Sequence, residues 1–147
     1  MAAREVAVAR INTRGVVVGG LVAGLIINVS EYILNEPVLG ARMAAALTAH
    51  NLPPIGGGAI AVFVIIGFLL GLVLVWLYAA IRPRFGAGPK TAAIAGGLVW
   101  FLDYFCGAVG FGALGLFPMN LILIALVWGL VELIAAALVG GRLYSEA

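Results

Sequence analysis

The sequence predicts an all-α integral membrane protein, folded as a bundle of four transmembrane helices. Of the 147 residues, 65% are hydrophobic and only 10% are charged, whereas a soluble domain carries about 25% charged residues. The hydrophobic residues gather into four long segments. Each segment would cross the ~30 Å hydrocarbon core of a bilayer as a helix, since a helix rises ~1.5 Å per residue. We therefore interpret residues 1–147 as a single membrane-embedded domain.

The four predicted helices cover about residues 15–34, 59–81, 91–113 and 118–139. Arginines precede the first helix and mimic a secretory signal, but the segment continues through Glu31 without a small-residue cleavage site. We expect this helix to be retained. The second and third helices are separated by RPRFGAGPK, whose prolines and glycines end one helix and start the next. The connection GALGLFPMN joins the third and fourth helices tightly.

The longest connection, between the first two helices, predicts a short amphipathic helix over about residues 37–50. Pro37 suits a first turn, and Leu39, Met43 and Ala46 recur at helical spacing. Asn51 and two prolines follow and would stop the helix. We expect it to lie on the outer membrane surface or across the mouth of the bundle.

The basic residues predict the orientation in the membrane. Arg42 falls in the first connection, whereas seven of the eight basic residues flank the other ends of the helices. These seven are Arg4, Arg10, Arg14, Arg82, Arg84, Lys90 and Arg142. Because basic residues concentrate in cytoplasmic loops, both termini are expected in the cytoplasm. The predicted location is a plasma membrane or a bacterial-type inner membrane.

Three predicted helices carry small and polar residues on one face. The first has Gly20, Gly24, Asn28, Glu31 and Asn35 at spacings of four, four, three and four. The third has Gly96, Trp100, Asp103, Gly107 and Gly110, and the fourth has Ala125, Trp128, Glu132 and Ala136. The second has a packing face of Gly67 and Gly71. Small residues let helix backbones approach closely, so we expect these faces to meet.

Counting from the basic anchors along the sequence places the polar residues at similar depths. A helix rises ~1.5 Å per residue, so Asn28, Asp103 and Trp128 lie ~20 Å from the cytoplasmic anchors. Glu132 and Trp100 lie at ~15 Å, near the centre of the bilayer, and Glu31 lies at ~25 Å. The carboxyl groups therefore form a predicted ladder from the outer surface to the middle of the membrane.

These carboxyl groups have no basic residue within the predicted spans. Asp103 and Glu132 therefore require protonation, contact with a water-filled cavity, or neutralisation by a cation or a partner chain. The competing interpretation is structural: a protonated acid can hydrogen-bond a neighbouring helix and hold the bundle together. The predicted ligand-binding residues are Asn28, Glu31, Trp100, Asp103, Tyr104, Trp128 and Glu132, whose aromatic members offer hydrogen bonds and ring faces for a cation.

Three functions fit this pattern. The first is binding or transport of a small ligand, a proton, a cation or an organic cation, by a homo-oligomer. The second is a membrane enzyme that isomerises, cyclises or opens an epoxide on a lipophilic substrate, with Asp103 and Glu132 as the catalytic acid/base pair. The third is an accessory subunit whose carboxyl groups meet partner membrane subunits.

Other functional classes are disfavoured by the sequence. The basic residues lie in loops and at helix ends instead of forming a soluble basic face. The expected partner is therefore the lipid bilayer and not nucleic acid. His50 has no nearby cysteines and predicts no metal site. Cys106 is a lone thiol in an apolar segment, for which packing is the expected role. No motif identifies a cofactor, whose nature stays unknown.

Overall fold

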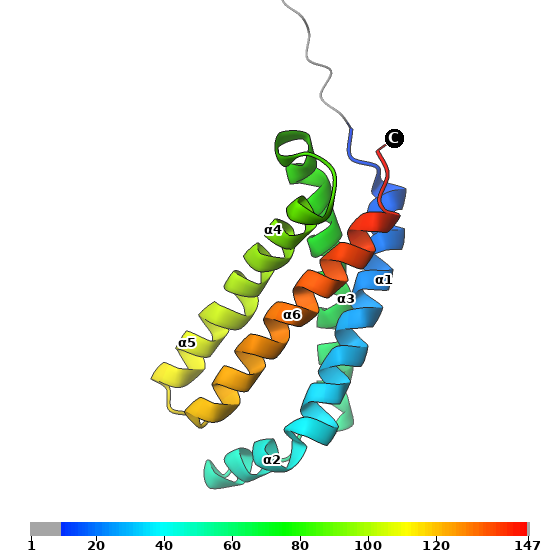
Figure 1. Ribbon diagram of the computed structural model, residues 1–147. Helices are drawn as coiled ribbons and strands as arrows, with labels where there is room; N and C mark the ends of the chain where they lie inside the picture. Colours follow the sequence, from blue (N-terminus) through cyan, green and yellow to red (C-terminus); the bar gives the residue numbers. More distant parts are fainter. Residues whose placement is uncertain (1–9, 147) are drawn as a thin grey trace, which may run out of the picture.

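The computed structural model describes residues 10–146, and these form a bundle of helices without strands (Figure 1). Arg4, one of the basic residues used to predict the orientation, lies outside this range. Four helices are long and apolar enough to cross a membrane: Thr13–Val38, Gly57–Phe85, Pro89–Ala113 and Met119–Leu143. By length and composition, the chain therefore has the four candidate spans and the all-helical class that the sequence predicts.

The first span ends in a bend that leads into a helix across one end of the bundle. It consists of α1 (Thr13–Ile33) and a π-helical turn, η1 (Leu34–Val38). Pro37 lies in this turn and has no backbone N–H to continue an α-helix. Helix α2 (Gly40–Ala49) follows and turns across the end opposite the C-terminus (Figure 1). Leu39 and Ala46 are buried there in a small cluster with Leu121.

The other three spans run along the length of the bundle. They are α3 (Gly57–Phe85), the composite rod of α4 (Pro89–Trp100), η2 (Phe101–Phe105) and α5 (Cys106–Ala113), and α6 (Met119–Leu143). The sequence predicts an uninterrupted α-helix for the third span, whereas the structure has the π-helical segment η2 in its middle. A π-helical turn holds more residues than an α-helical turn, so it rotates the residues that follow.

Glycines bring α1 and α3 into backbone contact. Gly20 and Gly24 of α1 face Gly67 and Gly71 of α3, and a Cβ added to Gly71 would overlap backbone atoms of both α1 glycines. This is the close approach expected from small residues four positions apart. Backbone atoms therefore approach one another directly at these glycines, with the side chains of Phe68 and Leu72 packed beside them.

Helices α3 and α6 each contact the other spans: α6 packs against α1, α3 and α4, and α3 packs against α1, α4 and α6. The buried face of α6 carries Leu133, Ala136 and Ala137 into the main core, together with Leu74 and Val75 of α3. In contrast, every residue from 57 to 66, at the start of α3, is exposed. The tight packing thus belongs to the end of the bundle near the termini and to its middle, while the helices separate toward α2 (Figure 1).

Candidate functional site

The polar centre of the bundle is a Tyr104 hydroxyl that lies between two carboxyl groups. Its oxygen is 2.5 Å from Oε1 of Glu31 and 3.0 Å from Oε1 of Glu132. Glu31 comes from α1, Tyr104 from η2 and Glu132 from α6, so three candidate spans meet at one hydroxyl. We call Glu31, Tyr104 and Glu132 the carboxyl–tyrosine triad.

Gly129 provides the space for the Tyr104 ring. A Cβ built on Gly129 would overlap the ring carbons of Tyr104, so any larger residue there would displace the ring. Gly129 precedes Glu132 by three residues on α6, and residues three apart share a helix face. The ring therefore packs on α6 at Gly129, and its hydroxyl points toward Glu132 of α6 and Glu31 of α1.

The donors and acceptors of the triad determine how many hydrogens it holds. A tyrosine hydroxyl has one hydrogen to donate, and an ionised carboxylate only accepts. Two hydrogen bonds from Tyr104 to two carboxyl groups therefore need a second hydrogen, carried by one of the carboxyls. Glu31 already accepts from the Asn35 side-chain amide at its other oxygen, at 2.8 Å. Glu132 is consequently the better position for that hydrogen.

Glu132 is the most enclosed member of the triad. Its exposed fraction is 4%, and its second oxygen, Oε2, is buried without a hydrogen-bond partner among residues 10–146. The single ion pair in the described chain joins Arg82 to Glu146, at the other end of the bundle, so no described basic residue neutralises Glu132. Burying an unpaired carboxylate is costly, whereas a carboxylic acid bonded to a hydroxyl is tolerated.

Other predicted site residues join helices nearby. The Trp128 indole donates to the Ser30 hydroxyl at 2.9 Å, linking α6 to α1. The Trp100 indole donates to the Leu126 carbonyl at 2.8 Å, linking α4 to α6. Asn28 donates to the carbonyls of Gly24 and Val64, at 2.8 and 3.2 Å. Each of these three side chains donates a hydrogen bond to another helix.

Asp103 is not brought into the triad. It is exposed and has no hydrogen-bond partner within the described chain, although the sequence places it on the same stripe as Trp100. The physical reason is η2. In a regular α-helix, positions 103 and 104 would both lie near the face that carries Trp100. In the wider π-helical turn, Tyr104 faces inward and Asp103 is rotated away.

Sequence reasoning left three contributing residues outside its set of site residues. Asn35, which holds Glu31, belonged to the predicted polar stripe of the first helix, so its spacing could have included it. Ser30 is adjacent to Glu31 but gave no signal of its own. Gly129 resembles other packing glycines, and only the Tyr104 ring against it reveals its role.

The described residues contain no group of three or more His, Cys, Asp or Glu side chains that could hold a metal ion. Two cavities lie away from the triad. One is at the end of the bundle near the termini, and the other lies between α2 and the start of α6. The triad itself offers a chain of oxygen atoms, which is suited to holding and passing hydrogens.

In comparisons with known proteins, the chain matches no family model, no curated protein and no solved structure.

Proposed function

We propose that this chain is an integral membrane protein that binds and transports protons, with the carboxyl–tyrosine triad as one step of their path. The observation that carries the proposal is the Tyr104 hydroxyl between Oε1 of Glu31 and Oε1 of Glu132. A hydrogen on Glu132 can pass to the tyrosine oxygen while the tyrosine hydrogen passes to Glu31. The net result moves one proton from Glu132 to Glu31 without moving either helix.

Position along the helices supports this route of transfer. Glu132 lies near the middle of its candidate span, Met119–Leu143, and Glu31 lies toward the η1 end of Thr13–Val38. Ionisable groups within membrane spans are expensive and commonly belong to proton relays. The triad therefore connects the middle of the bundle with the end that α2 covers.

Among the small ligands that the sequence suggests, the proton fits the geometry best. The described residues offer no metal-binding group. The indoles of Trp100 and Trp128 and the amide nitrogen of Asn28 donate to other helices. What remains at the centre is a set of carboxyl and hydroxyl oxygens at hydrogen-bonding distance from one another. Such a set needs a hydrogen and no larger ligand.

We extend the proposal to orientation. The described basic residues lie mostly at the end of the bundle that holds both ends of the described chain, which favours a cytoplasmic location for that end. Helix α2 then lies at the outer surface as an amphipathic helix, with Leu39 and Ala46 against the bundle. In this orientation Glu31 exchanges protons with the outer side.

Proton flux into liposomes tests the relay. The full chain is reconstituted with a pH-sensitive dye inside the vesicles, and a potassium gradient with valinomycin imposes the driving force. Tyr104→Phe keeps the ring on Gly129 but removes the hydroxyl, so we expect flux to fall about a hundredfold, the lower range for loss of a proton-transferring group. Glu132→Gln is expected to cause a similar loss.

Two matched variants control for surface changes. Tyr32→Phe alters an exposed tyrosine next to Glu31, and Asp103→Asn alters the exposed carboxyl group; both should conduct as the unchanged protein does. Circular dichroism and thermal unfolding verify that each variant is folded. If folded Tyr104→Phe conducts protons at the original rate, the triad is a structural hydrogen-bond cluster and the proposal fails.

A further inference from the structure

A cavity of about 240 Å³ opens near the C-terminal segment, where α3 and α6 end and α4 begins. Its lining includes Tyr78, Arg82, Gly88, Pro89, Arg142 and Tyr144. About 10–15 Å³ of such space holds one water molecule, so this cavity is far larger than a water site. It is separate from the carboxyl–tyrosine triad and plays no part in the proposed proton path.

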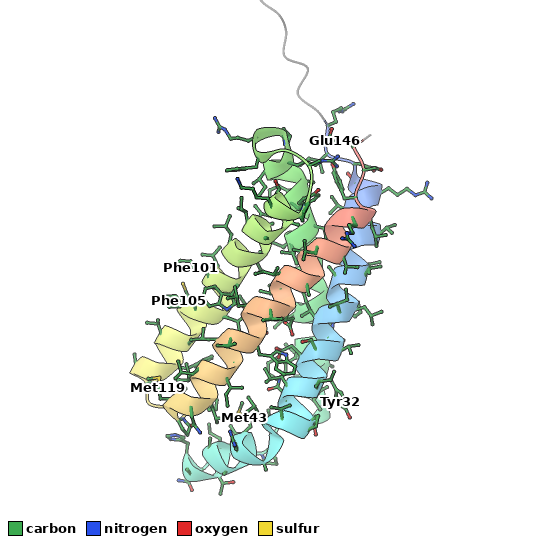
Figure 2. The ribbon with its side chains drawn as sticks, in the orientation of Figure 1. Tyr32, Met43, Phe101, Phe105, Met119 and Glu146 are labelled. Carbon is green, nitrogen blue, oxygen red and sulfur yellow. The ribbon has the colours of Figure 1, made fainter. Side chains whose placement is uncertain are left out.

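Arg82 is held at this cavity with part of its guanidinium unused. Its Nε lies 3.4 Å from Oε1 of Glu146, which Figure 2 shows at the end of the bundle where α6 ends. Its guanidinium carbon lies 5.6 Å from the centre of the Tyr144 ring, a cation–π distance. Its Nη1, however, is buried and has no hydrogen-bond partner among residues 10–146. A buried donor without an acceptor destabilises the fold.

A second positive side chain lines the same cavity. Arg142 is in the last turn of α6, and residues 10–146 provide it with no ion-pair partner, since their one ion pair is that of Arg82. Two guanidinium groups at one cavity repel each other unless an anion lies between them. The cavity therefore has two arginines in its lining, of which only Arg82 is paired with a described carboxylate, Glu146.

Uncharged donors add to this charge. The Tyr78 hydroxyl accepts from the Gly88 backbone N–H at 3.2 Å, which leaves its own hydrogen available to donate. Helix α4 begins beside it at Pro89, and its N-cap residue, Gly88, has no side chain to satisfy the first backbone N–H groups. The positive end of the α4 dipole thus faces the same region as the two arginines.

We propose that this cavity binds a phosphate group. Arginine pairs with phosphate through two parallel hydrogen bonds, and both Arg82 and Arg142 line this cavity. Ala92 and Leu138 add apolar surface to the lining, as the stem of a phospholipid headgroup requires. The phosphate can come from an anionic phospholipid, as in basic pockets between transmembrane helices, or from a soluble phosphate.

Two probes distinguish these sources. Native mass spectrometry of the full chain in detergent compares retention of phosphatidylglycerol with that of phosphatidylcholine carrying identical acyl chains. In lipid-free detergent, the thermal unfolding temperature is followed as inorganic phosphate replaces chloride at constant ionic strength. Preferential retention of phosphatidylglycerol identifies a headgroup site, and stabilisation by phosphate alone identifies a soluble ligand. Either result supports the phosphate site.

Arginine variants locate the binding. Arg82→Gln and Arg142→Gln should each weaken binding of the effective probe about tenfold, as expected for loss of a charge-assisted hydrogen bond. Arg84→Gln, an exposed arginine of the same helix that does not line the cavity, should bind as the unchanged protein does. Arg82→Gln also removes the Arg82–Glu146 ion pair and could unfold the chain. In that case Arg142→Gln, which leaves this pair in place, provides the test. Equal effects of Arg142→Gln and Arg84→Gln, or no preference for either probe in the unchanged protein, would overturn the proposal.

Discussion

Tyr104 is the side chain on which the proposed proton step depends, and its position depends on Gly129. The hydroxyl reaches carboxyl groups on two other helices only because the ring lies where Gly129 has no Cβ. A phenol is well suited to this position, since it can accept one hydrogen while donating another. At the scale of single residues, the site therefore depends on the Tyr104 ring packing directly against the backbone of Gly129.

Gly129→Ala tests that contact directly. The added methyl group overlaps the ring, so Tyr104 must move away from Glu132. We expect a loss of about 1–3 kcal/mol in the free energy of unfolding, typical of an overfilled interior, together with reduced proton flux. Thermal unfolding and the liposome assay measure the two effects.

Gly110→Ala is the matched control for this change, because nothing lies within 4 Å of a Cβ at Gly110. It should leave flux unchanged and should not lower stability, since alanine favours a helix over glycine. If Gly129→Ala unfolds at the original temperature and conducts at the original rate, the Tyr104 ring does not depend on the space at Gly129.

At the scale of helices, the bundle is assembled through backbone contacts at glycines. Gly71 of α3 faces Gly20 and Gly24 of α1, and Gly140 of α6 faces Gly19 of α1. In a bilayer, lipid is as apolar as leucine, so close packing and hydrogen bonds hold helices together where the hydrophobic effect does not. These contacts bring α1 close enough to α6 for Glu31 and Glu132 to share one hydroxyl.

Gly71→Ala should force α1 and α3 apart. Because its Cβ would meet backbone atoms, no rotamer change can relieve the overlap, and we expect a loss of about 1–3 kcal/mol in stability. Thermal unfolding in detergent measures it. Gly97→Ala in α4 is the control, since no atom lies within 4 Å of that position and alanine favours a helix over glycine. Equal stability of the two variants would contradict a close-packed α1–α3 interface.

The π-helical segment η2 determines which polar residue of the third span faces inward. Its aromatic side chains divide between two sides: Tyr104 turns to the triad, whereas Phe101 and Phe105 stack on each other with ring centres 5.2 Å apart. Both phenylalanines are exposed. The widened turn therefore exchanges Asp103 for Tyr104 at the centre of the bundle.

At the scale of the whole molecule, the two ends of the bundle differ in charge and packing. One end gathers arginines, the cavity lined by Arg82 and Arg142 and both ends of the described chain, and the other has α2 and the exposed start of α3. Residues 57–66 of α3 and the outward side of η2 are not covered by the described chain. In a membrane, lipid or another protein chain covers them.

The proposed orientation is testable with reporter fusions in a bacterial inner membrane. A reporter active only in the cytoplasm should function at the C-terminus and fail when inserted between α2 and α3, at residues 51–56. A reporter active only outside should show the reverse pattern. Because the orientation depends on the basic residues, the opposite result would contradict a cytoplasmic location for the termini.

By itself, the sequence determined the all-helical class, the four candidate spans and most of the polar residues at the centre, because apolar length and helical spacing are local properties. Only the tertiary structure decided that Tyr104, and not Asp103, lies between Glu31 and Glu132. That choice depends on one widened turn and on the depth to which a ring can enter at Gly129. Neither is encoded in spacing alone, since both arise when three helices pack against one another.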